Sequence, residues 1–171
     1  MENIIEAVPT EDIIKELTEE RFVRKTNFGH NEIYVVNAHN APNTMREIGR
    51  LREWAFRESG GGTGKSIDID EFDTRDEAYF EQLIVWDPVE KEILGGYRFI
   101  ECSKLPIKNN GQVDTPTSEL FYYSEDFIKN YLPYTIELGR SFIQPKYQST
   151  GNVRKSIFTL DNLWDGLGAV L

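Results

Sequence analysis

The stretch Glu137-Leu138-Gly139-Arg140-Ser141-Phe142-Ile143-Gln144-Pro145-Lys146-Tyr147 places two opposite charges inside a segment that otherwise has the apolar character of a core strand. An ionised Glu or Arg is costly to bury unless it is paired or bound to a ligand. Because side chains alternate between the two faces of a strand, Glu137 and Arg140 would face opposite sides unless Gly139 marks a β-bulge. The stretch therefore predicts either a bulged strand with both charges in one cleft or a structural Glu–Arg pair on a half-exposed strand.

The segments around this strand predict an α+β fold in which helices flank a central, mostly antiparallel mixed sheet. Four helices are expected: one capped by Thr10, an amphipathic one opened by Pro42, a short one capped by Ser124, and a final one over residues 157–167. Strands are expected near residues 22–24, 33–36, 80–86, 93–101 and 135–144.

The bulk composition is that of one globular domain over residues 1–171, in which residues 1–20 form a peripheral helical segment. A formal net charge of -10 argues against general binding to nucleic acid or to an anionic membrane surface. The chain contains one cysteine and two histidines, which supplies neither a disulfide nor a zinc site. We expect a cytoplasmic protein with possible peripheral contact at the inner face of the membrane, because no signal peptide or long apolar run is evident.

The last residues, Gly168-Ala169-Val170-Leu171, are apolar and carry no stop signal for the helix that precedes them. We therefore expect further strands that would cover this helix. Whether the 171 residues are active without such strands is left open.

A glycine-rich segment over residues 59–66, Ser-Gly-Gly-Gly-Thr-Gly-Lys-Ser, almost matches the phosphate-binding pattern G-x-x-x-x-G-K-[ST]. That pattern requires a strand before the loop and a helix after it, so that backbone N–H groups converge on the phosphates. Here a helix precedes the loop and the acidic residues 67–71 follow it. A flexible lid beside the site is the favoured interpretation, and nucleotide binding is the alternative.

Two further segments carry weak signals. Asp68, Asp70 and Asp73 do not form a calcium loop, because Phe72 occupies a ligand position and the central glycine is missing, so a solvated turn or a substrate site remains. Gly95-Gly96-Tyr97-Arg98 places two glycines inside a strand, which indicates a bulge or the close approach of another backbone, and its arginine could pair with a neighbouring acid.

Taken in order, four motifs resemble the acyl-homoserine-lactone synthases: Arg52-x-x-x-Phe56, Asp70-Glu71-Phe72-Asp73, Gly95-Gly96-Tyr97-Arg98 and Glu137-Leu138-Gly139-Arg140. With Leu83-Ile84-Val85-Trp86-Asp87, the sequence ELGRSFIQPKYQ and Leu163-Trp164-Asp165-Gly166-Leu167, the chain more closely resembles the ornithine- and glycine-lipid N-acyltransferases, often labelled hemolysin-like. Both groups are GNAT-superfamily enzymes, and the resemblance covers about residues 45–171. A Trp of the lactone synthases is missing, and the glycine loop takes its place.

The resemblance implies a GNAT-like fold and transfer of a fatty acyl group, commonly 3-hydroxylated, to the α-amine of ornithine or glycine for aminolipid synthesis. The donor would be the acyl-phosphopantetheine thioester of an acyl carrier protein, or acyl-CoA, with no bound cofactor and no metal. Glu137 would be the base, and backbone N–H groups from Gly139 to Ser141, beside Arg140, would stabilise the oxyanion. Substrate-binding residues would be Arg52, Phe56, Asp70, Asp73, Arg98 and Phe142, the aspartates attracting the ammonium group while the arginines bind the carboxylate or brace the acids.

Lys146, Arg154 and Lys155 form a local basic patch on an acidic chain, which suits either docking of an acidic carrier protein or a solvated loop. The coenzyme A loop of GNAT enzymes is only partly kept in Gln148-Ser149-Thr150-Gly151-Asn152. Three alternatives remain open: a lactone-synthase-like signal enzyme, a nucleotide-binding protein that uses the glycine loop, and a GNAT-like module that binds without catalysis.

Overall fold

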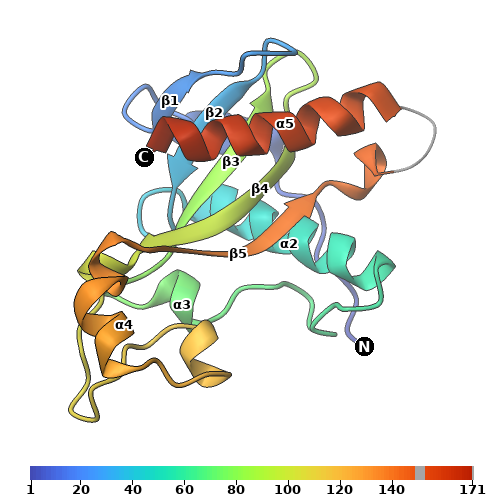
Figure 1. The fold of residues 1–171 in the computed structure, drawn as a ribbon. Coiled ribbons are helices and arrows are strands. Elements are labelled where there is room, and N and C mark those ends of the chain that lie inside the picture. Colours follow the sequence, from blue (N-terminus) through green and yellow to red (C-terminus); the bar gives the residue numbers. More distant parts are fainter. Residues whose placement is uncertain (149–152, 171) are drawn as a thin grey trace.

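The computed structural model describes residues 1–148 and 153–170, with side chains given outside residues 153–159. Its centre is a five-stranded sheet in the order β1-β2-β3-β4-β5 (Figure 1). The strands are β1 Phe22–Lys25, β2 Glu32–Val36, β3 Glu81–Asp87, β4 Glu92–Glu101 and β5 Ile136–Ile143. Every neighbouring pair among them is antiparallel. The α+β prediction is confirmed, although these strands include no parallel pair of the expected mixed sheet.

Five α-helices accompany the sheet: α1 Thr10–Glu16, α2 Pro42–Glu58, α3 Glu71–Thr74, α4 Glu125–Asn130 and α5 Val153–Val170. Pro42 opens α2 as expected, since a proline lacks only an N–H that the first turn leaves unbonded anyway. Ser124 caps α4 by accepting a hydrogen bond from the Phe127 amide. Thr10 is not a cap, because α1 begins at that residue and Pro9 precedes it without a capping side chain.

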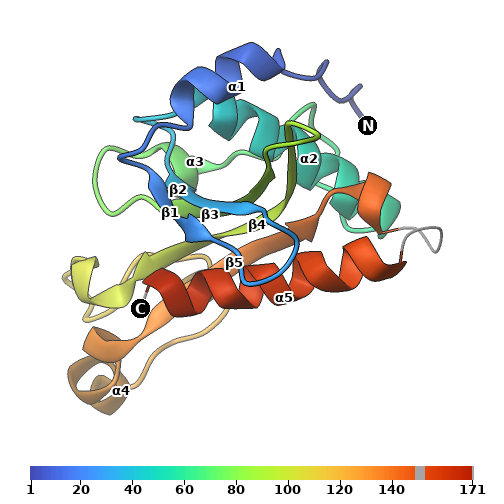
Figure 2. The same cartoon turned by 90° about the horizontal axis from the view of Figure 1, so that it is seen from above.

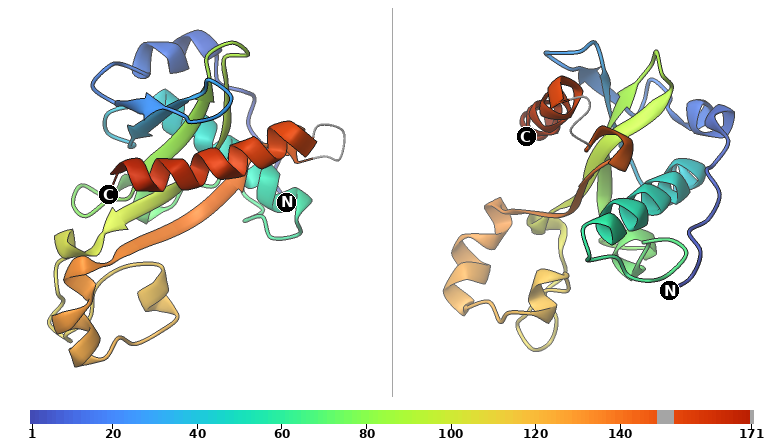
Figure 3. Two further views of the ribbon diagram at one scale, coloured as in Figure 1. Left: turned by 45° about the horizontal axis from the view of Figure 1, so that its top comes forward. Right: turned by 90° about the vertical axis from the view of Figure 1, so that its right-hand side faces the viewer.

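The two long helices lie on opposite faces of the sheet (Figure 3, right). On one face, α2 packs its buried stripe of Met45, Ile48, Leu51 and Ala55 towards the strands, with α1 outside it (Figure 2). The other face is covered by α5, whose Leu163 packs with side chains of β2, β3 and β4. The spacing that predicted α2 is thus explained by one buried face.

A third cluster lies under the lobe that connects β4 to β5, which projects away from the sheet at the lower left of Figure 1. This lobe holds α4 and three short 3-10 turns at Cys102–Lys104, Thr117–Glu119 and Leu132–Tyr134. Ile100 and Cys102 at the end of β4 pack there with Phe72 of α3. The lobe therefore packs against both α3 and the end of β4. At this end of β4 the pairing with β5 begins.

No helix in the described parts of the chain combines the length and the apolar character needed to cross a membrane. Helix α5 nevertheless exposes Leu160 and Trp164.

Candidate active site

The pairing of β4 with β5 contains the bulge that the sequence predicted. Arg98 lies opposite Gly139 and Gly96 lies opposite Phe142, so one residue of β4 faces two residues of β5. The distorted residue is Arg140, whose φ of 52° falls in the left-handed region. This conformation is unfavourable for a residue with a Cβ atom, and such strain is typical of functional sites. The bulge prediction is confirmed, but the unusual backbone belongs to Arg140 instead of Gly139.

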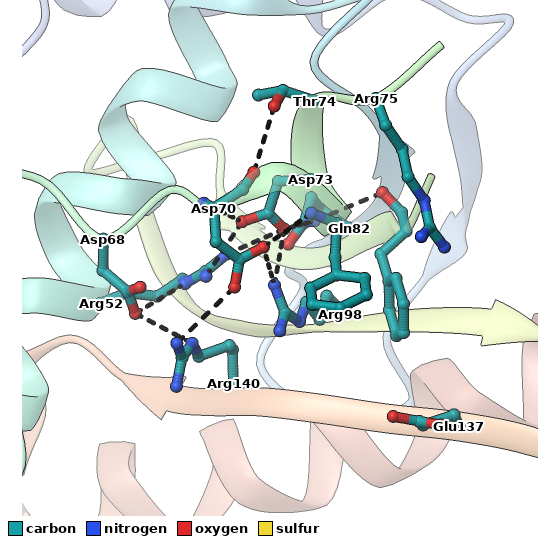
Figure 4. A network of polar contacts seen from close by, with 12 residues as sticks. Arg52, Asp68, Asp70, Asp73, Thr74, Arg75, Gln82, Arg98, Glu137 and Arg140 are labelled. Atoms are coloured by element: carbon teal, nitrogen blue, oxygen red, sulfur yellow. Dashed lines mark hydrogen bonds and ion pairs between the residues drawn. The ribbon is translucent and has the colours of Figure 1, made fainter. Parts of the chain in front are cut away.

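The bulge places Glu137 and Arg140 on one face of the sheet. Glu137 lies opposite Ile100, two residues from Arg98, so Glu137 and Arg98 share a face. Arg140 shares that face too, because its guanidinium reaches Asp70, to which Arg98 also binds (Figure 4). A regular strand would have turned Arg140 towards α5.

Six charged side chains meet on this face and form what we call the acid–arginine network: Arg52, Asp68, Asp70, Asp73, Arg98 and Arg140 (Figure 4). Its innermost member is Arg52 of α2, which is fully buried. Its Nε lies 3.3 Å from Asp68 Oδ2, and its Nη2 lies 3.2 Å from Asp73 Oδ2. The two carboxylates satisfy a charge that would otherwise be very costly to bury.

The outer half of the network consists of Arg98, Arg140 and Asp70. Arg98 Nη1 lies 2.7 Å from Asp70 Oδ1 and 3.3 Å from Asp73 Oδ1. Arg140 Nε lies 3.3 Å from Asp68 Oδ2, and its Nη2 lies 3.7 Å from Asp70 Oδ2. Burial alone would raise the pKa of Asp70, but Arg98 and the other two arginines outweigh it and hold this pKa below its usual value. Asp70 is therefore ionised near neutral pH.

The acidic turn has this shape because its aspartates cap α3. The Asp70 carboxylate accepts from the Phe72 amide, and the Asp73 carboxylate accepts from the Asp70 amide, which together make a reciprocal capping box. Gln82 of β3 adds a 3.0 Å hydrogen bond from Nε2 to Asp73 Oδ1. Neither Gln82 nor Asp68 was among the predicted substrate-binding residues. Asp68 and Asp70 are two positions apart, which is the spacing of residues on one face of a strand.

The members of the network differ in their access to solvent. Asp73 and Arg52 are fully buried, whereas the side chains of Asp70 and Arg140 are 29% and 37% exposed. Arg98 is buried, and its Nε has no hydrogen-bond partner among the described residues. A Cβ atom added to Gly139 would lie 3.5 Å from that Nε. Gly139 therefore lies directly against Arg98, whose Nε is buried.

Glu137 lies apart from the network. Its Oε1 accepts hydrogen bonds from the Thr117 amide at 3.1 Å and from the Thr117 hydroxyl at 2.9 Å. In the described part of the chain no ion pair joins it to Arg140, so the alternative of a structural Glu137–Arg140 pair is wrong. Thr117 was not among the residues predicted for the site, since nothing in its local sequence marks it.

A cavity of about 300 Å³ lies on the opposite face of β5, beneath α5. It is mainly apolar, and its walls are Tyr97, Leu138, Ser141, Leu160, Leu163, Trp164 and Leu167. The bulge therefore separates two environments, because Arg140 turns to the charged network while Ser141 turns to this cavity.

The remaining predicted residues lie away from the network. Phe142 is buried in the core on the α2 face, and Phe56 packs against the same cluster. Lys146 is exposed and pairs with Glu92 at 2.7 Å. The side chains of Arg154 and Lys155 lie outside the described residues.

The glycine loop is bound from inside the molecule. Glu53 of α2, which is fully buried, accepts hydrogen bonds from the Thr63 amide and hydroxyl and from the Gly64 amide, and it pairs with Arg57. Burial would raise the pKa of Glu53, but these bonds outweigh it and lower the pKa to about 2. A protein carboxylate thus occupies N–H groups that nucleotide binding would need, and the contacts favour a tethered loop over the flexible lid.

Comparison with known proteins agrees with this arrangement. Residues 51–156 match the family model described as an acetyltransferase (GNAT) domain. The chain is 55% identical over 170 residues to the glycine N(alpha)-acyltransferase of Bacteroides thetaiotaomicron, and 52% identical over 170 residues to the protein of that name from Phocaeicola vulgatus. The matches cover 99% of this chain but only 50% and 52% of those proteins, so the chain spans about half their length. No solved structure matches significantly. The family match spans the network and the bulged strand, and the chain belongs to the acetyltransferase (GNAT) domain family.

Proposed function

We propose that this chain carries the active site of an N-acyltransferase that moves a fatty acyl group from a thioester to the α-amine of glycine. The observation that carries the proposal is the bulge in β5, which presents a charged network on one face and an apolar cavity on the other. A small zwitterion suits the first surface and a hydrocarbon chain suits the second. The names of the two relatives favour glycine over ornithine as the acceptor.

The acceptor would bind at the exposed edge of the network. Asp70 attracts the ammonium group, Arg140 at 37% exposure binds the carboxylate, and the buried Arg98 holds Asp70 in place. Asp73 has no surface left for a substrate, so we assign it to bracing Arg52 and Arg98. Arg52 likewise acts through the aspartates that it holds in place.

Glu137 would act as the general base, directly or through a water molecule. The α-amine of an amino acid is mostly protonated near neutral pH and must lose a proton before it can attack. Glu137 first takes the proton of the ammonium group and releases it to solvent. As the amine nitrogen then attacks the thioester carbonyl, a C–N bond forms and Glu137 takes a second proton from that nitrogen. When the intermediate collapses, the C–S bond breaks, and the leaving thiolate takes this second proton from Glu137. Backbone N–H groups between Gly139 and Ser141 would stabilise the intermediate oxyanion.

The acyl chain would occupy the cavity under α5, whose walls include Ser141 of the bulge. We propose an acyl carrier protein as the donor, since this acidic chain has a local basic patch at Lys146, Arg154 and Lys155 that would attract an acidic partner. An N-acylated glycine is amphipathic, and membrane aminolipid synthesis is its proposed use.

The test is an assay of the purified chain with an acyl carrier protein thioester and glycine, in which thiol release and N-acylglycine are measured together. We expect product with glycine, less with ornithine, and a loss of about 100-fold or more in kcat for Glu137→Gln. Binding of the carrier without thiol release for any amine would instead indicate a module without catalysis. A melting temperature raised by ATP or GTP, but not by the acyl carrier, would indicate a nucleotide-binding protein.

The cavity is tested by the length of the acyl chain. Leu138→Trp fills it from the strand side, and we expect the rate with long acyl chains to fall more than the rate with short ones. Leu120→Trp changes an exposed leucine outside the cavity and is the matched control. An equal loss for long and short chains in Leu138→Trp would place the acyl group elsewhere.

A further inference from the structure

The side-chain carboxylate of Glu137 is held by Thr117, which lies 20 positions earlier in the chain. Thr117 donates both its backbone N–H and its hydroxyl to Oε1 of the carboxylate. Within the described residues no hydrogen bond is made to Oε2. Two donors on one oxygen fix the orientation of the carboxylate and leave the other oxygen to receive a proton.

The loop that carries Thr117 is itself built to stay in place. Its two ends are joined by Gln112, whose side chain donates to the Tyr123 carbonyl at 3.0 Å and accepts from the Tyr123 amide at 2.9 Å. Next to Thr117, the Thr115 amide donates to the Ser118 hydroxyl at 2.9 Å, and that hydroxyl donates to the Thr115 carbonyl at 2.8 Å. Thr115 is fully buried, which anchors the loop to the lobe.

We propose that Thr117 is a positioning residue, which orients the Glu137 carboxylate so that Oε2 can accept the proton of the attacking amine. This inference rests on the proposed function, since it assigns Thr117 a task only if Glu137 is the base. Thr117 touches neither the acceptor nor the thioester in this scheme. It acts through the carboxylate alone.

The experiment compares Thr117→Val, Thr117→Ser and Thr135→Val in the same transfer assay. Thr117→Val keeps the shape of the side chain but removes the hydroxyl, and we expect kcat to fall about 10-fold, since a hydrogen bond to a charged group is lost. KM for glycine should stay within about twofold, because the acceptor contacts are untouched.

Thr117→Ser restores the hydroxyl and should restore kcat. Thr135→Val is the matched control, because the Thr135 hydroxyl donates to the Tyr131 carbonyl at 2.8 Å and makes no hydrogen bond to Glu137. Wild-type kinetics in Thr117→Val, or an equal loss in Thr135→Val, would overturn the inference.

The two proposals fail in different ways. If Glu137→Gln abolishes transfer but Thr117→Val behaves like the wild type, only the positioning role is lost. If Glu137→Gln keeps full activity, Glu137 is not the base, and the inference about Thr117 is overturned with it.

Discussion

Glu137 and Arg140 are three residues apart in β5, yet their side chains lie on the same face of the sheet. In a regular strand this spacing would turn them to opposite faces. The bulge at Arg140, whose backbone is left-handed, inserts one extra residue into β5. The side chains of Glu137 and Arg140 therefore point to the same face. The relationship is maintained by contacts on both sides, because Thr117 holds the glutamate while Asp68 and Asp70 hold the arginine.

The strain at Arg140 can be measured with two variants that both lack the guanidinium. Arg140→Ala keeps a Cβ atom at a φ of 52°, whereas Arg140→Gly removes it. We expect Arg140→Gly to be more stable than Arg140→Ala by about 1 kcal/mol in urea unfolding. Both variants should bind glycine poorly. Equal stability of the two would mean that the backbone at this position is not strained.

Gly96 of β4 and Gly139 of β5 should respond differently to substitution by alanine. A Cβ atom at Gly96 would lie 2.6 Å from the Leu83 carbonyl oxygen, so Gly96→Ala forces the sheet apart and should cost roughly 1–3 kcal/mol of unfolding free energy. In Gly139→Ala the nearest atom to the added methyl group would be Arg98 Nε at 3.5 Å, which is an ordinary contact distance. The unfolding free energy of this variant should stay within about 0.5 kcal/mol of the wild type.

Arg52 is expected to be the most sensitive charged residue for stability. Arg52→Met leaves the buried carboxylates of Asp68 and Asp73 without their main partner, which should lower the unfolding free energy by roughly 3–5 kcal/mol. Arg46→Met makes the same substitution at an exposed position of α2 and should change stability by less than about 0.5 kcal/mol. Similar losses in both variants would contradict a special role for the network.

Glu53 should make the fold sensitive to acid. Its pKa falls from an ordinary 4.5 to about 2 on folding, so the stabilisation is fully present above pH 4.5 and is lost as the pH falls towards 2. Glu53→Gln should therefore be less stable at pH 7, with a gap that narrows through this window in urea unfolding. Glu58→Gln, at an exposed position of the same helix, should show no such narrowing.

Much of the architecture could be predicted because it depends on local pattern. The apolar stripe of α2 and the Ser124 cap arise within short segments, and the structure has both where they were expected. The strands β3 and β4 were also predicted close to where the structure has them. Thr10 failed as a cap because α1 already includes that residue.

The sequence by itself identified a strand with an unusual charged pair, for which a bulge was one of two predictions, and its resemblance to known enzymes linked the acidic turn with the arginines. Only the tertiary structure decided which charges are buried and what each one touches. Asp73 became a brace, Glu53 filled the glycine loop, and Thr117 became the partner of Glu137. These contacts join residues 10 to 20 or more positions apart, and the backbone that aligns them is set by packing of the whole sheet, which no local pattern encodes.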